Sequence, residues 1–187
     1  LSNIYTDLGI DNSKKNENIL RKYLYAKVNL DSITFIEFAK KFGYNLIITG
    51  TNLDTQNTDY FSVNTFPNMD VVQALLITSC IPIIYKPITF NDNLYIDGGI
   101  YSNFPIEYFK KHSNDTLGIC INPESMKNND TIINYLTNIL FSMMNKLSYD
   151  NIHKNKNEYN ICLISFKSSC IDDISFSFED MEIKTND

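Results

Sequence analysis

An aspartate followed by two glycines is the part of this sequence best suited to chemistry. The turn Asp97-Gly98-Gly99 directly follows the apolar residues 94–96 (LYI), which predicts a carboxylate at the end of a strand. A side chain placed there can project into a site, and glycines allow a close approach of backbone or substrate because they carry no Cβ atom. Asp-Gly is also an everyday turn dipeptide, so local sequence alone favours a purely structural turn.

The other ionisable and metal-binding residue types offer weaker candidates. His112 and His153 occur in polar stretches and are expected at the surface. The four cysteines are Cys80, Cys120, Cys162 and Cys170. They form no C-x-x-C pair and have no histidine at metal-ligand spacing, so we interpret them as reduced and expect no metal or cofactor. Four acidic residues occur where helix caps, turns or solvated surface explain them: Glu37, Asp54, Asp59 and Asp70.

Composition narrows the possible partners. A chain of 187 residues with 43% hydrophobic content fits one domain with a core, and 16 basic against 22 acidic residues give a net charge of −6. This balance argues against nucleic-acid binding and means that contact with lipid would depend on apolar area. Met143 and Met144 could provide such area, although packing against a sheet is the commoner role. No signal segment or membrane span is evident, so we expect a cytoplasmic protein with peripheral membrane contact.

Helical and strand patterns alternate along the chain, which predicts an α/β fold with a mainly parallel sheet and crossover helices. Apolar spacing predicts helices over 16–26, 34–42, 69–80 and 130–147, and a further helix after Asn103-Phe104-Pro105. Predicted strands cover 46–51, 60–63, 116–122 (buried) and 160–166, with 88–90 and 94–96 as a hairpin. Residues 167–187 are expected to hold a last edge strand or a tail. Thr34 and Glu37 fit a capping box, and Gly43 fits the end of that helix.

The motifs around the aspartate resemble a known family when they are taken in order. Residues 71–82 (VVQALLITSCIP), Pro87, residues 94–99 (LYIDGG) and Asn103-Phe104-Pro105 closely resemble the C-terminal signature of the patatin-like phospholipases. Residues 33–38 and 46–53 also look like the linking helix and the next sheet strand of that family. The resemblance covers about residues 8–166, and its specificity comes from the order and spacing of the motifs.

The resemblance implies a fold and a chemistry. The fold would be the patatin-like variant of a three-layer α/β/α hydrolase, with residues 1–187 as a single, partial, N-terminally truncated domain. The activity would be lipid acyl ester hydrolysis of the phospholipase A type, on a phospholipid or another acyl lipid and without a cofactor. Asp97 would be the catalytic base of a serine–aspartate dyad, and Gly98 and Gly99 would be binding residues.

One departure from the family pattern concerns the nucleophile. The family carries its serine in Gly-x-Ser-x-Gly, and none of the six glycines here completes that motif. We therefore expect the serine in a preceding segment, and the 187 residues alone to be inactive. Two alternatives stay open: a degenerate, non-catalytic relative that binds lipid or a protein partner, and an unrelated α/β binding domain in which residues 97–99 are only a turn.

Overall fold

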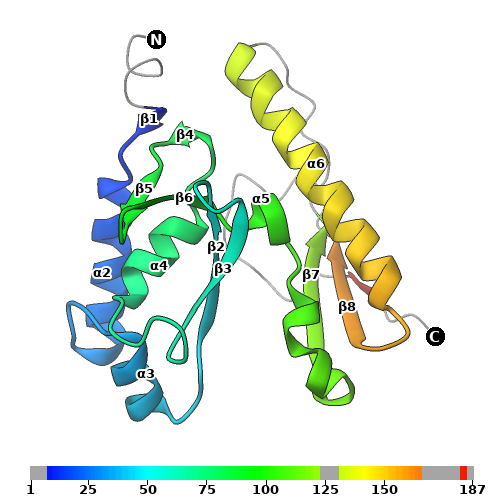
Figure 1. Ribbon diagram of the computed structural model, residues 1–187, viewed down its shortest axis with the longest axis horizontal. Helices are drawn as coiled ribbons and strands as arrows, with labels where there is room; N and C mark the ends of the chain where they lie inside the picture. Colours follow the sequence, from blue (N-terminus) through cyan, green and yellow to red (C-terminus); the bar gives the residue numbers. More distant parts are fainter. Residues whose placement is uncertain (1–7, 123–130, 166–181, 185–187) are drawn as a thin grey trace. The chain divides into compact units, whose positions relative to one another are not determined.

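The computed structural model describes residues 8–122, 131–165 and 182–184, and the chain forms two compact units, Leu1–Ser102 and Asn103–Asp187. Helices and strands alternate in both units (Figure 1), so the predicted α/β class is confirmed. Parallel pairs occur in each unit, alongside antiparallel ones. The assignment of residues 1–187 to a single domain stays a prediction.

The first unit contains two sheets and four helices among its described residues. The larger sheet has the strand order β3-β2-β6-β5 and is antiparallel throughout, and the smaller one pairs β1 with β4 in parallel. In chain order the elements are β1 (Gly9–Asp11), α2 (Lys14–Val28), α3 (Phe35–Phe42), β2 (Ile47–Asn52), β3 (Asn57–Ser62), α4 (Val71–Thr78), β4 (Ile83–Tyr85), β5 (Ile88–Phe90), β6 (Asn93–Asp97) and α5 (Gly99–Ser102).

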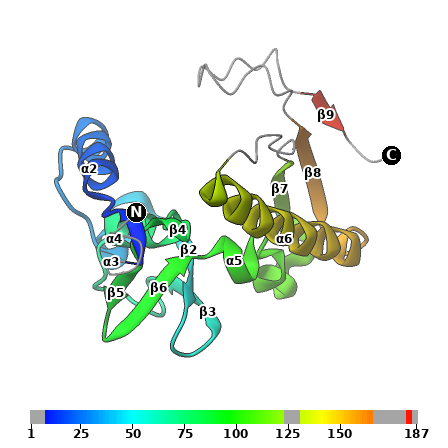
Figure 2. The ribbon, with the colours of Figure 1, turned by 90° about the horizontal axis from the view of Figure 1, so that it is seen from above.

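The second unit is a parallel strand–helix–strand unit with an added edge strand. Its described elements are a 3₁₀ segment η1 (Ile106–Asp115), β7 (Leu117–Asn122), α6 (Ile132–Asn155), β8 (Asn160–Ser165) and β9 (Glu182–Lys184). β7 and β8 are parallel and are connected through α6, which runs beside them (Figures 1 and 2), whereas β9 pairs antiparallel with β8. The predicted edge strand is thus found at Glu182–Lys184, and the rest of 167–187 lies outside the described residues.

The ends of α3 follow from local sequence. The Thr34 hydroxyl accepts a hydrogen bond from the Glu37 backbone N–H, and the Glu37 carboxylate accepts one from the Thr34 backbone N–H, which completes the predicted capping box. Gly43 closes the helix in the left-handed region with φ 76°. The hydrogen bonds from Thr34 also lower the pKa of Glu37.

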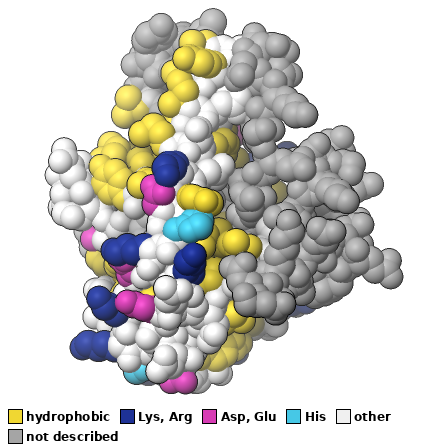
Figure 3. Space-filling view, turned by 90° about the vertical axis from the view of Figure 1, so that its right-hand side faces the viewer, with side chains coloured by type: hydrophobic (Ala, Val, Ile, Leu, Met, Phe, Trp, Pro, Cys, Tyr) yellow, Lys and Arg dark blue, Asp and Glu magenta, His cyan; other side chains and the backbone are white. Residues whose placement is uncertain are grey.

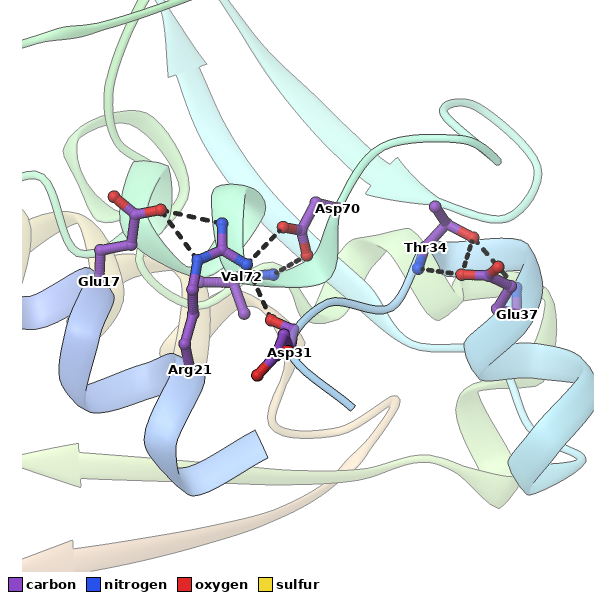
Figure 4. A network of polar contacts seen from close by, with 7 residues as sticks. All are labelled: Glu17, Arg21, Asp31, Thr34, Glu37, Asp70 and Val72. Carbon is purple, nitrogen blue, oxygen red and sulfur yellow. Dashed lines mark hydrogen bonds and ion pairs between the residues drawn. The ribbon is translucent and has the colours of Figure 1, made fainter. Parts of the chain in front are cut away.

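Helix α4 is held at its start by polar contacts. Asp70 accepts a hydrogen bond from the Val72 backbone N–H at 3.0 Å and so caps the helix. The guanidinium of Arg21 on α2 forms ion pairs with Asp70 at 3.0 Å and with Glu17 at 2.9 Å, and it donates to the Asp31 carbonyl (Figure 4). These groups are partly exposed, so we expect a modest stability contribution and a definite register between α2 and α4.

The core of the first unit lies between α4 and the larger sheet. A Cβ atom at Gly50 of β2 would lie 2.6 Å from the Phe61 ring and 2.8 Å from an Ile77 methyl, so the helix packs closely on the strand. This contact requires glycine at the centre of β2. The buried cluster consists of Ile33, Phe35, Ile48, Phe61, Met69, Val71, Ala74, Ile77 and Tyr95.

The β2–β3 hairpin extends further than its sequence suggests. The predicted strands 46–51 and 60–63 leave residues 52–59 as a connection, but Asn52 pairs directly with Asn57, and the connection is only 53–56. The Asn52 side-chain oxygen accepts hydrogen bonds from the Asp54 and Thr55 backbone N–H groups, which stabilises a tight turn. Polar residues such as Asp59 therefore belong to a strand. The sequence does not predict the short strands β1 and β4, which pair with each other in parallel and, unlike the equally short β5, are not joined to their partner by a hairpin turn.

The prediction of a fully buried strand over 116–122 is wrong for one face of β7. Alternate residues Leu117, Ile119 and Ile121 are exposed in the described structure. The opposite face is covered, since a Cβ atom at Gly118 would lie 2.6 Å from both Phe104 and Ile106, and Cys120 packs against the same small cluster. The apolar run thus predicted a strand but not which of its faces would be covered.

The face of helix α6 that packs inward also differs from the face that its apolar residues predict. Met144 packs inward and is 8% exposed, as expected for the core, whereas Met143 is 61% exposed. Polar residues point inward because they bind the segment after the first unit: Ser148 accepts from the Asn103 amide at 2.7 Å, and the Asn151 amide donates to the Phe104 carbonyl at 2.6 Å. The face of the molecule in Figure 3 shows exposed hydrophobic side chains among charged ones. The exposed aliphatic and methionine residues of α6 are Ile132, Leu136, Ile139, Met143 and Leu147, and Tyr135 and Tyr149 are exposed as well.

Candidate active site

Asp97 is the last residue of β6, and its backbone is fixed from two sides. It lies opposite Gly50 in the register of β6 with β2. Its own N–H donates to the carbonyl oxygen of Cys80, just beyond α4, at 2.9 Å. Strand β2 and the end of α4 therefore determine the backbone position from which the Asp97 side chain extends.

One oxygen of the Asp97 carboxyl group is anchored and the other is available. Oδ1 accepts a hydrogen bond from the Gly99 backbone N–H at 2.7 Å, whereas Oδ2 has no partner among the described residues. Asp97 is half-buried. Burial raises the pKa of Asp97, and the hydrogen bond from Gly99 opposes that rise. A carboxylate with a raised pKa and one free oxygen is suited to accept a proton from a nearby hydroxyl.

The two glycines have different structural roles next to Asp97. A Cβ atom at Gly98 would lie 2.4 Å from the Thr49 hydroxyl oxygen and 2.5 Å from the Thr49 carbonyl oxygen, so this position accepts no side chain. The Gly98 carbonyl accepts from the Ser102 N–H at 3.0 Å and closes the single turn of α5. Gly99 orients the carboxylate through its N–H. Packing and orientation thus explain both glycines, and their contact with a substrate stays a prediction.

A polar cluster of Tyr95, Asn52 and Asp59 involves β6 two residues before the candidate base, and its Asp59 is half-buried. The Tyr95 hydroxyl donates to the Asp59 carboxylate at 2.7 Å, and the Asn52 amide donates to the same carboxylate oxygen at 3.0 Å. Burial and the nearby Asp59 charge raise the pKa of Tyr95 above its ordinary value, so its hydroxyl remains a donor at neutral pH. The cluster ties β6 to β2 and β3. Asp59 is predicted from sequence only as a surface or turn residue, because its partners come from other strands.

Tyr95→Phe should lower the free energy of unfolding of the full-length gene product by about 1–3 kcal/mol, because it removes a donor from the half-buried Asp59 carboxylate. Urea unfolding measures the change. Tyr23→Phe is the matched control, since that side chain is 67% exposed and should change stability little. Equal unfolding free energies for the two variants would show that the Tyr95 hydroxyl contributes no net stability.

Other residues considered from sequence lie apart from Asp97 or serve structural roles. Glu37 and Asp70 cap helices, and Asp54 accepts from the Leu94 backbone N–H at 2.6 Å. His112 and His153 are exposed, as expected. Cys80 is buried, Cys120 and Cys162 are half-buried, and Cys170 lies outside the described residues.

A cavity in the first unit lies away from Asp97. Its volume is about 390 Å³, and its lining includes Ser13, Arg21, Asp70, Gln73 and Leu76, from α2, α4 and the residue before each helix. Asp97 does not contribute to this lining, and the charges of Arg21 are already satisfied by Glu17 and Asp70. The cavity is therefore separate from the chemistry suggested by Asp97. Among the described residues, no helix is both long and apolar enough to cross a membrane.

A family profile matches the segment of the chain that contains this aspartate. The profile described as "Patatin-like phospholipase" matches residues 1–110, which include β6 and the Asp97-Gly98-Gly99 turn. The chain therefore belongs to the patatin-like phospholipase family. The α/β architecture is that expected for this family.

Two viral proteins are similar to this chain. "Probable lipid hydrolase 463L" of Invertebrate iridescent virus 6 is 40% identical over 102 residues, which are 52% of this chain and 35% of that protein. "Uncharacterized protein R571" of Acanthamoeba polyphaga mimivirus is 30% identical over 154 residues, which are 78% of this chain and 50% of that protein. The chain thus spans a third to a half of the length of these relatives. The name of the first relative supports hydrolysis of lipids at the level of the family.

Proposed function

We propose that the complete protein hydrolyses acyl esters of phospholipids or related acyl lipids through a serine–aspartate dyad. Asp97 is the general base of that dyad, and Gly98 and Gly99 form the part of the site that lies next to the substrate. The observation that carries this proposal is a half-buried carboxyl group whose Oδ1 is held by Gly99 and whose Oδ2 has no partner in the part of the chain that the structure describes. Membership of a family of lipid hydrolases supports the choice of substrate.

In the proposed reaction, the serine hydroxyl attacks the ester carbonyl while its proton moves to Oδ2 of Asp97. The C–O bond to the leaving alcohol then breaks, and Asp97 returns the proton to that alcohol. Water attacks the resulting acyl-serine with the same base, which releases the fatty acid and restores the serine. A serine hydroxyl needs such a base because it is a poor nucleophile on its own at neutral pH.

The nucleophile belongs to a segment outside these 187 residues, because no Gly-x-Ser-x-Gly occurs in them. The 187-residue chain alone is therefore inactive in ester hydrolysis, since a base without its nucleophile forms no acyl-enzyme. We place the protein in the cytoplasm with peripheral contact to membranes, without nucleic-acid partners and without a cofactor. The net charge of −6 supports contact through apolar area rather than through attraction to anionic lipids.

Active-serine labelling of the full-length gene product tests this proposal. A fluorophosphonate probe should attach to the serine of a Gly-x-Ser-x-Gly motif, and the protein should release fatty acid from phosphatidylcholine vesicles. Replacing that serine with alanine should abolish both signals. A gene product without this motif, unlabelled and inactive, would instead support the second candidate: a degenerate relative that binds lipid or a protein partner. The missing motif in the present residues is the observation that favours that candidate.

A further inference from the structure

Cys80 connects the end of α4 to two other segments of the first unit. Its side chain is 0% exposed, and its thiol donates to the Lys86 carbonyl oxygen at 3.0 Å. Its own carbonyl oxygen accepts from the Asp97 N–H at 2.9 Å. Any residue at this position would supply that carbonyl, so the specific contribution of cysteine lies in the thiol and its burial.

The Lys86 peptide group that receives the thiol is fixed on its other side as well. The Lys86 N–H donates to the Asp11 carbonyl on β1 at 2.8 Å. The same stretch packs against β1 so closely that a Cβ atom at Gly9 would lie 2.4 Å from the Tyr85 carbonyl carbon. The Cys80 thiol therefore joins the small β1–β4 sheet to the point where α4 meets Asp97.

The electrostatic surroundings of Asp97 fit this arrangement. Burial, followed by the charge of Asp97, raises the pKa of Cys80 to about 12, so the thiol is uncharged at neutral pH. The pKa of Asp97 is raised by burial, and among the described residues only the Gly99 N–H opposes that rise, with no contribution from a charged side chain. A neutral, buried thiol at the end of α4 adds no charge that would lower the pKa of the Asp97 carboxylate.

We propose that Cys80 is a positioning residue for Asp97, whose thiol holds the α4 end against the Lys86 carbonyl and keeps the carboxylate shielded from water. This inference rests on the proposed function, because it concerns the same base. Cys80 has no contact with a reacting atom in this role. It acts by determining where Asp97 lies and how well water reaches it.

Cys80→Ala in the full-length gene product removes the donor and opens space beside the base. We expect kcat for ester hydrolysis to fall roughly tenfold with KM little changed, because a displaced base is a less effective one. The acid limb of the pH profile of kcat should move to lower pH, because water admitted beside Asp97 stabilises its charged form. A purely structural role would lower the amount of folded enzyme but would not move this limb.

Cys80→Ser and Cys120→Ala complete the experiment. The serine variant keeps a donor for the Lys86 carbonyl, so its kcat should remain within about threefold of the unsubstituted protein. Cys120→Ala, in the second unit, should leave both kcat and the acid limb unchanged. An alanine variant with unchanged kcat and acid limb overturns the inference. If that variant does not fold, a folded serine variant with a tenfold loss overturns it instead. Activity retained by Asp97→Asn would refute the dyad itself, which separates the two failures.

Discussion

Asp97→Asn in the full-length gene product should reduce kcat for ester hydrolysis by about 10²- to 10⁴-fold while KM changes little. The amide can still accept the hydrogen bond from Gly99 through Oδ1, but it cannot take a proton from a serine hydroxyl. The expected loss is that of a positioned general base. Release of fatty acid from phosphatidylcholine vesicles measures the change.

The stability of the same variant provides a second readout with a defined sign. Burial raises the pKa of Asp97, so folding favours its protonated form. Below the ordinary aspartate pKa of about 4, folded and unfolded chains are both protonated, and the carboxyl group costs no stability. The cost appears as pH rises from that value through the raised pKa, and it persists above it. Asparagine avoids this cost, so Asp97→Asn should raise Tm at neutral pH and change it little at a pH below about 3.5.

Asp92→Asn is the matched control for both measurements. Asp92 is exposed in the β5–β6 turn with φ 60°, a conformation that asparagine adopts readily. This variant should keep the activity and the Tm of the unsubstituted protein. Hydrolysis by Asp97→Asn at the rate of Asp92→Asn would remove Asp97 from the mechanism, and an unchanged Tm at neutral pH would show that its burial is not costly.

Local signals account for the elements that the sequence predicts well. The capping box of Thr34 and Glu37 and the closing Gly43 all lie within or next to α3, so neighbouring residues alone determine its ends. The β5–β6 hairpin is similar, because Asn91 and Asp92 supply the left-handed turn between two apolar segments. The position of Asp97 at a strand end follows from the same local pattern.

Distant contacts account for what the sequence does not predict. The apolar periodicity of α6 identifies one face of the helix, yet Ser148 and Asn151 turn the opposite face inward by binding Asn103 and the Phe104 carbonyl. Nothing within α6 reveals those partners. The candidate site has the same property, because the contacts of the Asp97 turn with Cys80 and Thr49 join segments far apart in the chain. The family resemblance points to the aspartate, but the contacts that hold it come from distant segments and are visible only in the folded chain.

Gly98→Ala should be the second most damaging change, through geometry rather than through lost chemistry. The added methyl group would lie 2.4 Å from the Thr49 hydroxyl oxygen and 2.5 Å from the Thr49 carbonyl oxygen. The backbone of β2 cannot yield as a flexible side chain would, so the turn that carries Asp97 must move. We expect a stability loss of about 1–3 kcal/mol from overpacking. A displacement near 1 Å should also reduce kcat by about 10²-fold.

Two further variants separate these causes. Gly43→Ala introduces the same methyl group where nothing lies within 4 Å, although φ is +76° there. It should cost about 1–2 kcal/mol through the left-handed conformation and leave kcat unchanged. Adding Thr49→Ala to Gly98→Ala removes the clash with the hydroxyl but leaves the one with the carbonyl oxygen, so it should not restore activity. Full recovery in that double variant would show that the Thr49 side chain, and not the β2 backbone, sets the position of the Asp97 turn.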